Sequence, residues 1–244
     1  MENSNKTFQN YIVIGVALII ASIIISYGIM NIRDTSRTIT VKGYAELQIT
    51  SDLAKWDMEV VGFHPSDKGE AYKIMQSNKE KALEYLKKNG ISKEMIIEGS
   101  LNFNSEYDFV YGEVSQQRFR GYSSRQILSI TSNNVDKIKE ISSKINDLVL
   151  EGVDINSMPP QYFISDLNKY KVKMLGESLK DAKKRAVELA DGVEDKIGGL
   201  KSARQGIFQI TAVNSTDITD WGVYDVSSKE KVIKSVVDAT FYIK

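Results

Sequence analysis

The sequence predicts an α+β fold: a mostly antiparallel sheet with helices packed on it, in the order ββαββαβαββ, preceded by one N-terminal transmembrane helix. Two observations lead to this prediction. Residues 11–30 form one uncharged apolar run. From residue 38 onward, segments of period two, typical of half-buried strands, alternate with segments of helical period. We therefore expect a short N-terminal tail (1–10), an anchor (11–30), a linker (31–37) and one α+β domain (38–244).

The apolar run begins at Tyr11, passes through Ile20 and ends at Met30. About 20 apolar residues are needed to cross about 30 Å of hydrocarbon. A buried core helix would keep a polar stripe, which this run lacks. A cleaved signal peptide is the alternative, because Ser26 and Gly28 could serve at a cleavage site. The run is long for a signal peptide, so the sequence favours an anchor that stays in the lipid bilayer.

The basic residues around the run give a weak signal for orientation. Only Lys6 precedes the run, whereas Arg33, Arg37 and Lys42 follow it. Counted alone, these residues favour a cytoplasmic C-terminal domain. A single N-terminal apolar segment is also a means of export, so the residues themselves leave the orientation open.

Two strands and a helix open the domain. Residues 38–49 and 54–61 alternate between apolar and polar side chains, and we expect the two strands to pair antiparallel. Asp67 and Glu70 have the spacing of a capping box. The helix that follows ends at Asn89 and Gly90, where glycine can adopt the left-handed conformation.

A long β-hairpin comes next, built from residues 101–111 and 118–131. Its aromatic side chains gather near the turn, where the domain's own core is least able to bury them. Aromatic residues presented in this way favour a protein interface. The alternative is that a helix of the same chain covers them. The candidate self-association residues are Tyr107, Phe109, Tyr111, Phe119 and Tyr122.

The rest of the domain reads as helix, strand, helix and two closing strands. Helical spacing predicts helices at about 135–148 and 166–197. Pro159 and Pro160 make the strand between them an edge strand or a bulge. The closing strands are expected at about 200–213 and 231–243.

The composition excludes many kinds of catalyst. The chain has 244 residues, no cysteine, one histidine, and 32 basic against 32 acidic residues. Without cysteine there are no disulfides, thiolate nucleophiles or cysteine-bound metals. Zero net charge argues against a general nucleic-acid binder. The phosphate-binding and nucleophile-elbow glycine motifs are absent. We therefore expect no cofactor, no metal site, no catalytic residue and no nucleic-acid partner.

Three weaker features remain. His64 has no second histidine to share a metal, and we interpret it as a residue at a strand end. Asp57 and Glu59 share a strand face, with Glu46 expected nearby, and such carboxylates could do acid–base chemistry. We interpret them as the solvent face of a half-buried sheet. The basic residues 183–185 lie among acidic ones, as on a solvated helix face.

Arg118 and Arg120 interleave with Phe119 and Tyr122 in the manner of a single-strand nucleic-acid binder. The patch is short and the chain supplies no net positive charge. The same aromatic residues therefore remain better explained as part of a protein interface.

Several short motifs in order resemble the SIMPL-domain (YggE-like) family. They are Thr40-Val41-Lys42-Gly43-Tyr44-Ala45-Glu46, Asp52-Leu53-Ala54, Asn89-Gly90-Ile91, Glu94-Met95-Ile96, Tyr107, Gly121-Tyr122, Ala182-Lys183-Lys184-Arg185-Ala186, Leu189-Ala190 and Lys196-Ile197-Gly198. Ser51 stands where the family usually has proline. The resemblance covers about 38–244.

The resemblance implies an exported or cell-envelope domain with no established catalytic residues, self-assembly in at least some members, and a loose association with stress tolerance. It favours a domain outside the cytoplasm. We thus expect a non-enzymatic, single-pass protein of the cell membrane that forms a homo-oligomer. The alternative is an extracytoplasmic binding module for a small molecule or wall component. An enzyme using Glu46, Asp57 or Glu59 is disfavoured.

Overall fold

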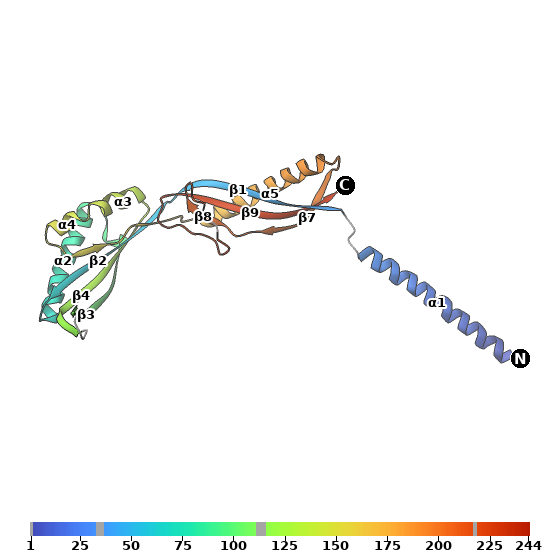
Figure 1. Ribbon diagram of the computed structural model, residues 1–244, viewed down its shortest axis with the longest axis horizontal. Coiled ribbons are helices and arrows are strands. Elements are labelled where there is room, and N and C mark those ends of the chain that lie inside the picture. Colours follow the sequence, from blue (N-terminus) through green and yellow to red (C-terminus); the bar gives the residue numbers. More distant parts are fainter. Residues whose placement is uncertain (1, 33–36, 111–115, 217–218) are drawn as a thin grey trace. The chain divides into compact units, whose positions relative to one another are not determined.

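The computed structural model describes residues 2–32, 37–110, 116–216 and 219–244, with side chains described at 13–29, 37–109, 117–216 and 219–244. The fold is α+β with antiparallel sheets, as the sequence predicts (Figure 1). The chain divides into two compact units, one of Met1–Val41, Lys183–Ala203 and Ala239–Lys244 and the other of Lys42–Ala182 and Arg204–Asp238.

The N-terminal segment is a single helix, α1 (Glu2–Ile32), so the helical part of the prediction is correct. Its described side chains, from Val13 to Ile29, are almost all exposed. Among the residues that the structure describes, no helix is both long enough and apolar enough to count as a membrane span. The structure therefore does not support the expected transmembrane helix.

One sheet has the strand order β1 (Thr38–Thr50), β9 (Glu230–Ile243), β7 (Ile197–Gln205), with β8 (Gln209–Ala212) also paired to β9. Buried and half-buried residues alternate along β9, which gives the strand one face toward the core; it lies between β1 and β7 in the strand order. The long helix α5 (Leu167–Asp191) packs beside this sheet (Figure 1). Ser178 of α5 and Ser235 of β9 are hydrogen-bonded through their hydroxyl groups at 3.2 Å.

The other sheet has the order β3 (Ile96–Val110), β4 (Gln116–Ser132), β2 (Leu53–His64), β5 (Ile155–Ser157), and β6 (Gln161–Phe163) also pairs with β2. Helices α2 (Lys68–Lys88), α3 (Val135–Lys144) and α4 (Asp147–Leu150) cover one face (Figure 1). A short 3-10 turn, Lys93–Met95, leads into β3. The core beneath the helices is centred on Trp56, Met58 and Leu128, all fully buried.

The pairing expected between the first two strands is wrong. β1 pairs with β9, whereas β2 pairs with β4, so consecutive strands enter different sheets. The reason lies at Asp52, which does not close a turn. Its carboxylate accepts hydrogen bonds from the Ser165 amide at 2.7 Å and the Ser165 hydroxyl at 2.5 Å. The chain passes through Ser51 and Asp52 from one sheet into the other.

Other boundaries also differ from the expected order. The proline-containing strand is two short strands, β5 and β6, because Pro159 and Pro160 lie between them and lack amide hydrogens. The first closing strand is likewise two, β7 and β8. Helix α5 ends at Asp191, next to Gly192, rather than at Ile197.

The cap of α2 confirms half of the predicted capping box. The Asp67 carboxylate accepts hydrogen bonds from the amides of Gly69 at 2.7 Å and Glu70 at 3.0 Å. In a full capping box, the Glu70 side chain accepts a hydrogen bond from the Asp67 amide. Here that amide donates instead to Nδ1 of His64, at 2.9 Å. The single histidine thus helps to fix the turn between β2 and α2.

Replacing Asp67 with alanine is expected to lower the free energy of unfolding by about 1 kcal/mol, because two amides of the first turn lose their acceptor. Urea unfolding of the two proteins measures the difference. Ser66→Ala, one residue earlier in the same exposed turn, is the control and should leave stability unchanged. Equal stability of Asp67→Ala and wild type would contradict the assigned cap.

Candidate interaction surface

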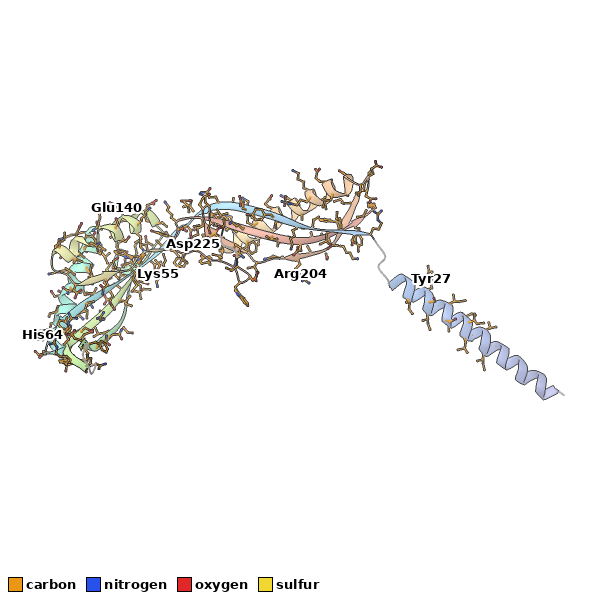
Figure 2. The ribbon with its side chains drawn as sticks, in the orientation of Figure 1. Tyr27, Lys55, His64, Glu140, Arg204 and Asp225 are labelled. Carbon is orange, nitrogen blue, oxygen red and sulfur yellow. The ribbon has the colours of Figure 1, made fainter. Side chains whose placement is uncertain are left out.

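The β3–β4 hairpin extends beyond the rest of its sheet. The last residues of β2 and β4 to pair are His64 and Tyr122. The pairing of β3 with β4 continues past that point to Val110 and Gln116. Figure 2 shows His64 at this end of the sheet. The end of the hairpin is therefore a two-stranded arm with no third strand beside it in the part of the chain that is described.

A glycine fixes the base of this arm. The register of β3 and β4 shifts between Glu106 and Tyr107, so that Arg120 is an extra residue on β4. Gly121 follows, with a φ of 155°. A Cβ there would lie 2.6 Å from the carbonyl oxygen of His64 and 2.7 Å from Cα of Pro65. Only glycine allows the hairpin to pass this close to the end of β2.

The described aromatic side chains on one face of the arm, which we call the aromatic tip, are Tyr107, Phe109, Phe119 and Tyr122. Tyr107 and Phe119 face each other across the strands, with ring centroids 5.7 Å apart, and Phe119 is 5.1 Å from Tyr122. Both pairs have the edge-to-face geometry that aromatic rings prefer. Tyr111, which the sequence also predicts here, lies outside the described residues.

The aromatic tip continues the apolar face of the sheet past its helical cover. Phe103, on the same face of β3, still meets α2 through Tyr72, at a centroid distance of 6.1 Å. Beyond it, Tyr107 is 49% exposed, Phe109 62% and Phe119 44%, while Tyr122 is half-buried. Helix α2 does not cover these residues because it begins only at Lys68. The tip is thus an apolar surface without a partner among the described residues.

The opposite face of the hairpin is polar and internally paired. Arg125 donates to Glu106 at 3.0 Å and to Glu59 at 3.3 Å. Ser123 also donates to Glu106, at 2.5 Å. The hydrogen bond from Ser123, and then that from Arg125, holds the pKa of Glu106 below its usual value. One face of the hairpin is therefore stabilised by ion pairs and hydrogen bonds, and the other face is apolar.

The lowered pKa of Glu106 makes this network sensitive to acid. Its contribution to stability is present above the unfolded-state pKa of glutamate and is lost as the pH falls through the lower folded-state pKa. The Glu106→Gln variant keeps the shape of the side chain but not its charge. We expect its free energy of unfolding to fall less than that of wild type when the pH is lowered from 7 to 3. Urea midpoints at pH 7 and pH 3 measure the effect. An equal acid loss in both proteins would contradict it.

Each of the three carboxylates considered for acid–base chemistry is bound to its own local partners. Glu46 lies on β1 and accepts a hydrogen bond from the Tyr44 hydroxyl at 2.6 Å. Asp57 accepts from Ser129 at 2.6 Å and pairs with Lys55. Glu59, on the same strand as Asp57, is held by Arg125 and Asn156. Burial and then the Glu46 carboxylate raise the pKa of Tyr44 to about 12. No group of metal-binding residues occurs among the described residues.

The basic residues near the tip are occupied by local contacts. Arg118 forms an ion pair with Asp108 at 3.3 Å, directly across the hairpin. The Arg120 guanidinium lies over the ring of Phe63, 5.1 Å from its centroid. The basic run at 183–185 is exposed on α5. These contacts tie the two arginines to acidic and aromatic partners within the sheet.

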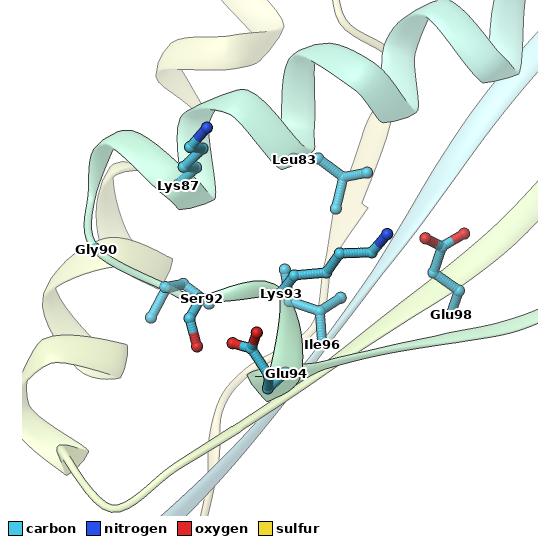
Figure 3. Close-up of a pocket in the computed structure, with 9 residues that line it drawn as sticks. Leu83, Lys87, Gly90, Ser92, Lys93, Glu94, Ile96 and Glu98 are labelled. Atoms are coloured by element: carbon cyan, nitrogen blue, oxygen red, sulfur yellow. The ribbon is translucent and has the colours of Figure 1, made fainter.

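A pocket that the sequence did not reveal lies at the other end of β3. It has a volume of about 590 Å³ and lies between the end of α2, the turn after it and the start of β3 (Figure 3). The lining is Leu83, Lys87, Gly90, Ile91, Ser92, Lys93, Glu94, Ile96 and Glu98. The sequence signal that could have indicated this pocket was the helix end at Gly90, because the chain turns away from α2 at that residue.

Three comparisons relate this chain to known proteins. The model of the family described as "SIMPL: Protein of unknown function (DUF541)" matches residues 39–240. No curated protein matches the chain. Among solved structures, the ligand-free regulatory subunit of aspartate kinase from Thermus thermophilus is 14% identical. That match covers 82% of this chain and 88% of the other, with a TM-score of 0.18, too low to support an argument about fold or function.

The family match includes the residues of the β1 motif, the Asn89–Gly90 helix end and the long α5 helix. It begins at Ile39 in β1 and ends at Thr240 in β9, so it spans both sheets and all the helices between them. Because the match covers most of the chain, the protein belongs to the SIMPL family.

Proposed function

We propose that this protein is a non-enzymatic protein of the cell envelope, held at a lipid bilayer by α1, that assembles with copies of itself through the aromatic tip. The observation that supports self-association most directly is the exposure of Tyr107, Phe109 and Phe119 on one face of the hairpin. A link to envelope or oxidative stress tolerance rests on family membership alone.

The amount of apolar surface at the tip fits an interface. A Phe or Tyr side chain can bury about 150–250 Å². Aromatic residues are enriched at the buried centres of protein interfaces. The Arg118–Asp108 ion pair lies on the opposite face of the same two strands, so no charged pair interrupts the aromatic face. The tip therefore has the composition of an interface centre.

The support for membrane attachment comes from α1. Residues 11–30 contain no charged side chain. Large apolar residues from Val13 to Ile29 are exposed, Ile20 by 53% and Ile24 by 66%. An exposed apolar helix surface of this size is costly in water. A bilayer is the partner whose chemistry matches it, and the family resemblance favours a domain outside the cytoplasm.

Two lysines in α1 are expected to release the protein from membranes. A Lys near the centre of a membrane helix costs about 3 kcal/mol, so Ile20→Lys with Ile24→Lys removes about 6 kcal/mol. Flotation of the full chain with lipid vesicles measures the loss. Leu189→Lys with Val193→Lys adds the same charge at other exposed apolar positions and is the control. Equal flotation of both variants would contradict attachment through α1.

The pocket supports a second candidate function, an extracytoplasmic binding module for a small molecule or wall component. Its apolar lining from Leu83, Ile91 and Ile96 and its charged rim suit an amphiphilic ligand. A rise in unfolding temperature with a bound amphiphile, lost on filling the pocket with Leu83→Trp, is the expected result. No shift across a broad ligand library would count against this candidate.

A further inference from the structure

The outer edge of β3 has no neighbouring strand among the described residues. β3 ends the strand order β3–β4–β2–β5, and its 15 residues pair with β4 on one side only. Backbone amides and carbonyls therefore face outward along this edge. Proteins usually protect such an edge with lysine, proline, bulges or a covering segment. Most side chains from Leu101 to Phe109 are exposed, and no strand that the structure describes pairs with this edge.

The middle of this edge is suited to pairing. The register with β4 is irregular between Glu98 and Leu101 and again between Glu106 and Tyr107. Between these points, residues 101–106 form one regular stretch without proline or lysine. The groups that satisfy a free strand edge are those of another polypeptide backbone. The edge can thus accept a second extended strand.

The two ends of β3 are complementary to each other. At its start, Ile96 and Glu98 line the pocket, which is mainly apolar. Near its end, Phe109 projects an aromatic ring that is 62% exposed. Ile96 and Leu101 pair with Ile130 and Gln126, which lie on the helix-covered face of β4, and Phe109 follows Leu101 on that same face by alternation. A receptor and a protruding ring therefore lie at opposite ends of one free edge.

A two-fold axis brings these ends together. Along an edge strand, only every second residue points its backbone N–H and C=O toward the neighbouring strand. When two identical strands pair antiparallel, these outward-pointing residues must lie opposite one another. The two-fold axis therefore passes through a residue and not between two residues. An axis at Phe103 or Asn104, within the regular stretch, sets Phe109 of one copy opposite Ile97 or Gly99 of the other. These positions flank Glu98, at the mouth of the pocket.

Resting on the self-association proposed above, we infer that two copies join antiparallel along β3 around a two-fold axis near Phe103 and Asn104, with Phe109 of each copy seated in the other's pocket. Both contacts form twice in such an isologous pair. The exposed ammonium groups of Lys87 and Lys93 at the pocket then lie near an aromatic face, which attracts cations. A second copy uses the free edge, the pocket and the protruding ring together.

The absence of cysteine from the chain makes this pairing directly testable. Single variants Phe103→Cys and Asn104→Cys of the full chain, in mild detergent, are oxidised and the disulfide-linked dimer is quantified. At least one should cross-link at least tenfold more than Ser202→Cys, an exposed control on the edge strand β7. A mixture of Phe109→Cys with Glu98→Cys should give the mixed dimer in excess over either variant alone.

The outcomes separate the two proposals. If the protein assembles but neither Phe103→Cys nor Asn104→Cys exceeds the β7 control, β3 pairing is wrong and self-association stands. If the mixed dimer is absent while the central cysteines cross-link, Phe109 does not fill the pocket. A chain that stays monomeric at every concentration overturns both. Two central positions are used so that misfolding of one variant does not decide the result.

Discussion

Replacing Gly62 with alanine is expected to lower the free energy of unfolding by about 3 kcal/mol. Gly62 lies on β2, where α2 crosses the sheet. A Cβ there would be 2.2 Å from the carbonyl oxygen of Ala71 and 2.3 Å from the amide nitrogen of Met75. Both are backbone atoms of a regular helix, so α2 as a whole must move away. That movement opens the core around Met75 and the sheet beneath it.

Gly176→Ala is the matched control for this change. Gly176 lies inside α5, and a Cβ there meets no atom within 4 Å. Alanine in a helix interior should therefore stabilise the protein by about 0.5–1 kcal/mol. Urea unfolding of both variants gives the comparison. If Gly62→Ala were as stable as Gly176→Ala, the close approach of α2 to β2 would be wrong.

Removing two rings of the aromatic tip is expected to dissociate the assembly while leaving each copy folded. Tyr107 and Phe109 are largely exposed, so Tyr107→Ala with Phe109→Ala costs the folded copy chiefly one edge-to-face contact with Phe119, about 1 kcal/mol. At an interface each ring counts as a central residue, and truncation costs about 2 kcal/mol or more. Two rings together weaken binding about a thousandfold.

Leu150→Ala with Val172→Ala is the control for this effect. Leu150 is 88% exposed and Val172 73%, and neither lies on the hairpin. This variant removes two exposed apolar side chains and should leave the assembly intact. Sedimentation velocity at several concentrations distinguishes the variants. Equal assembly of the hairpin variant and wild type would show that the tip is not the interface.

Local patterns predicted the elements better than their pairing. Alternation located β1, β2, the hairpin and β9, and the Asp67 cap and the Gly90 stop bounded α2, because these signals act within a few residues. Which strands become neighbours depends on contacts far apart in the sequence. Asp52 binds Ser165, 113 residues away, at the point where the chain passes from β1 in one sheet to β2 in the other.

A buried lysine shows a second limit. Alternation places Lys231 on the inward face of β9, but its charge predicts exposure, and it is in fact fully buried. Its ammonium donates to the backbone carbonyl of Asp225 at 2.6 Å. Burial lowers the pKa of Lys231, and the nearby Asp225 carboxylate opposes that shift. Because the hydrogen-bond partner of Lys231 lies outside β9, the alternation along that strand could not predict the burial of its ammonium group.

The candidate interface was accessible to sequence reasoning only in part. The aromatic residues were predictable because they recur at period two near a turn. Their exposure depends on β2 ending at His64 and α2 beginning at Lys68, which together leave the arm uncovered. The pocket depends on how the end of α2 meets the start of β3, and no local pattern encodes that meeting.

The mass of the full chain in mild detergent, measured by light scattering over a range of protein concentrations, tests the central claim most directly. Self-association through the hairpin predicts a protein mass of at least two copies of 27.4 kDa. The same measurement on Tyr107→Ala with Phe109→Ala should give a single copy. A wild-type protein of one copy at every concentration would contradict the account.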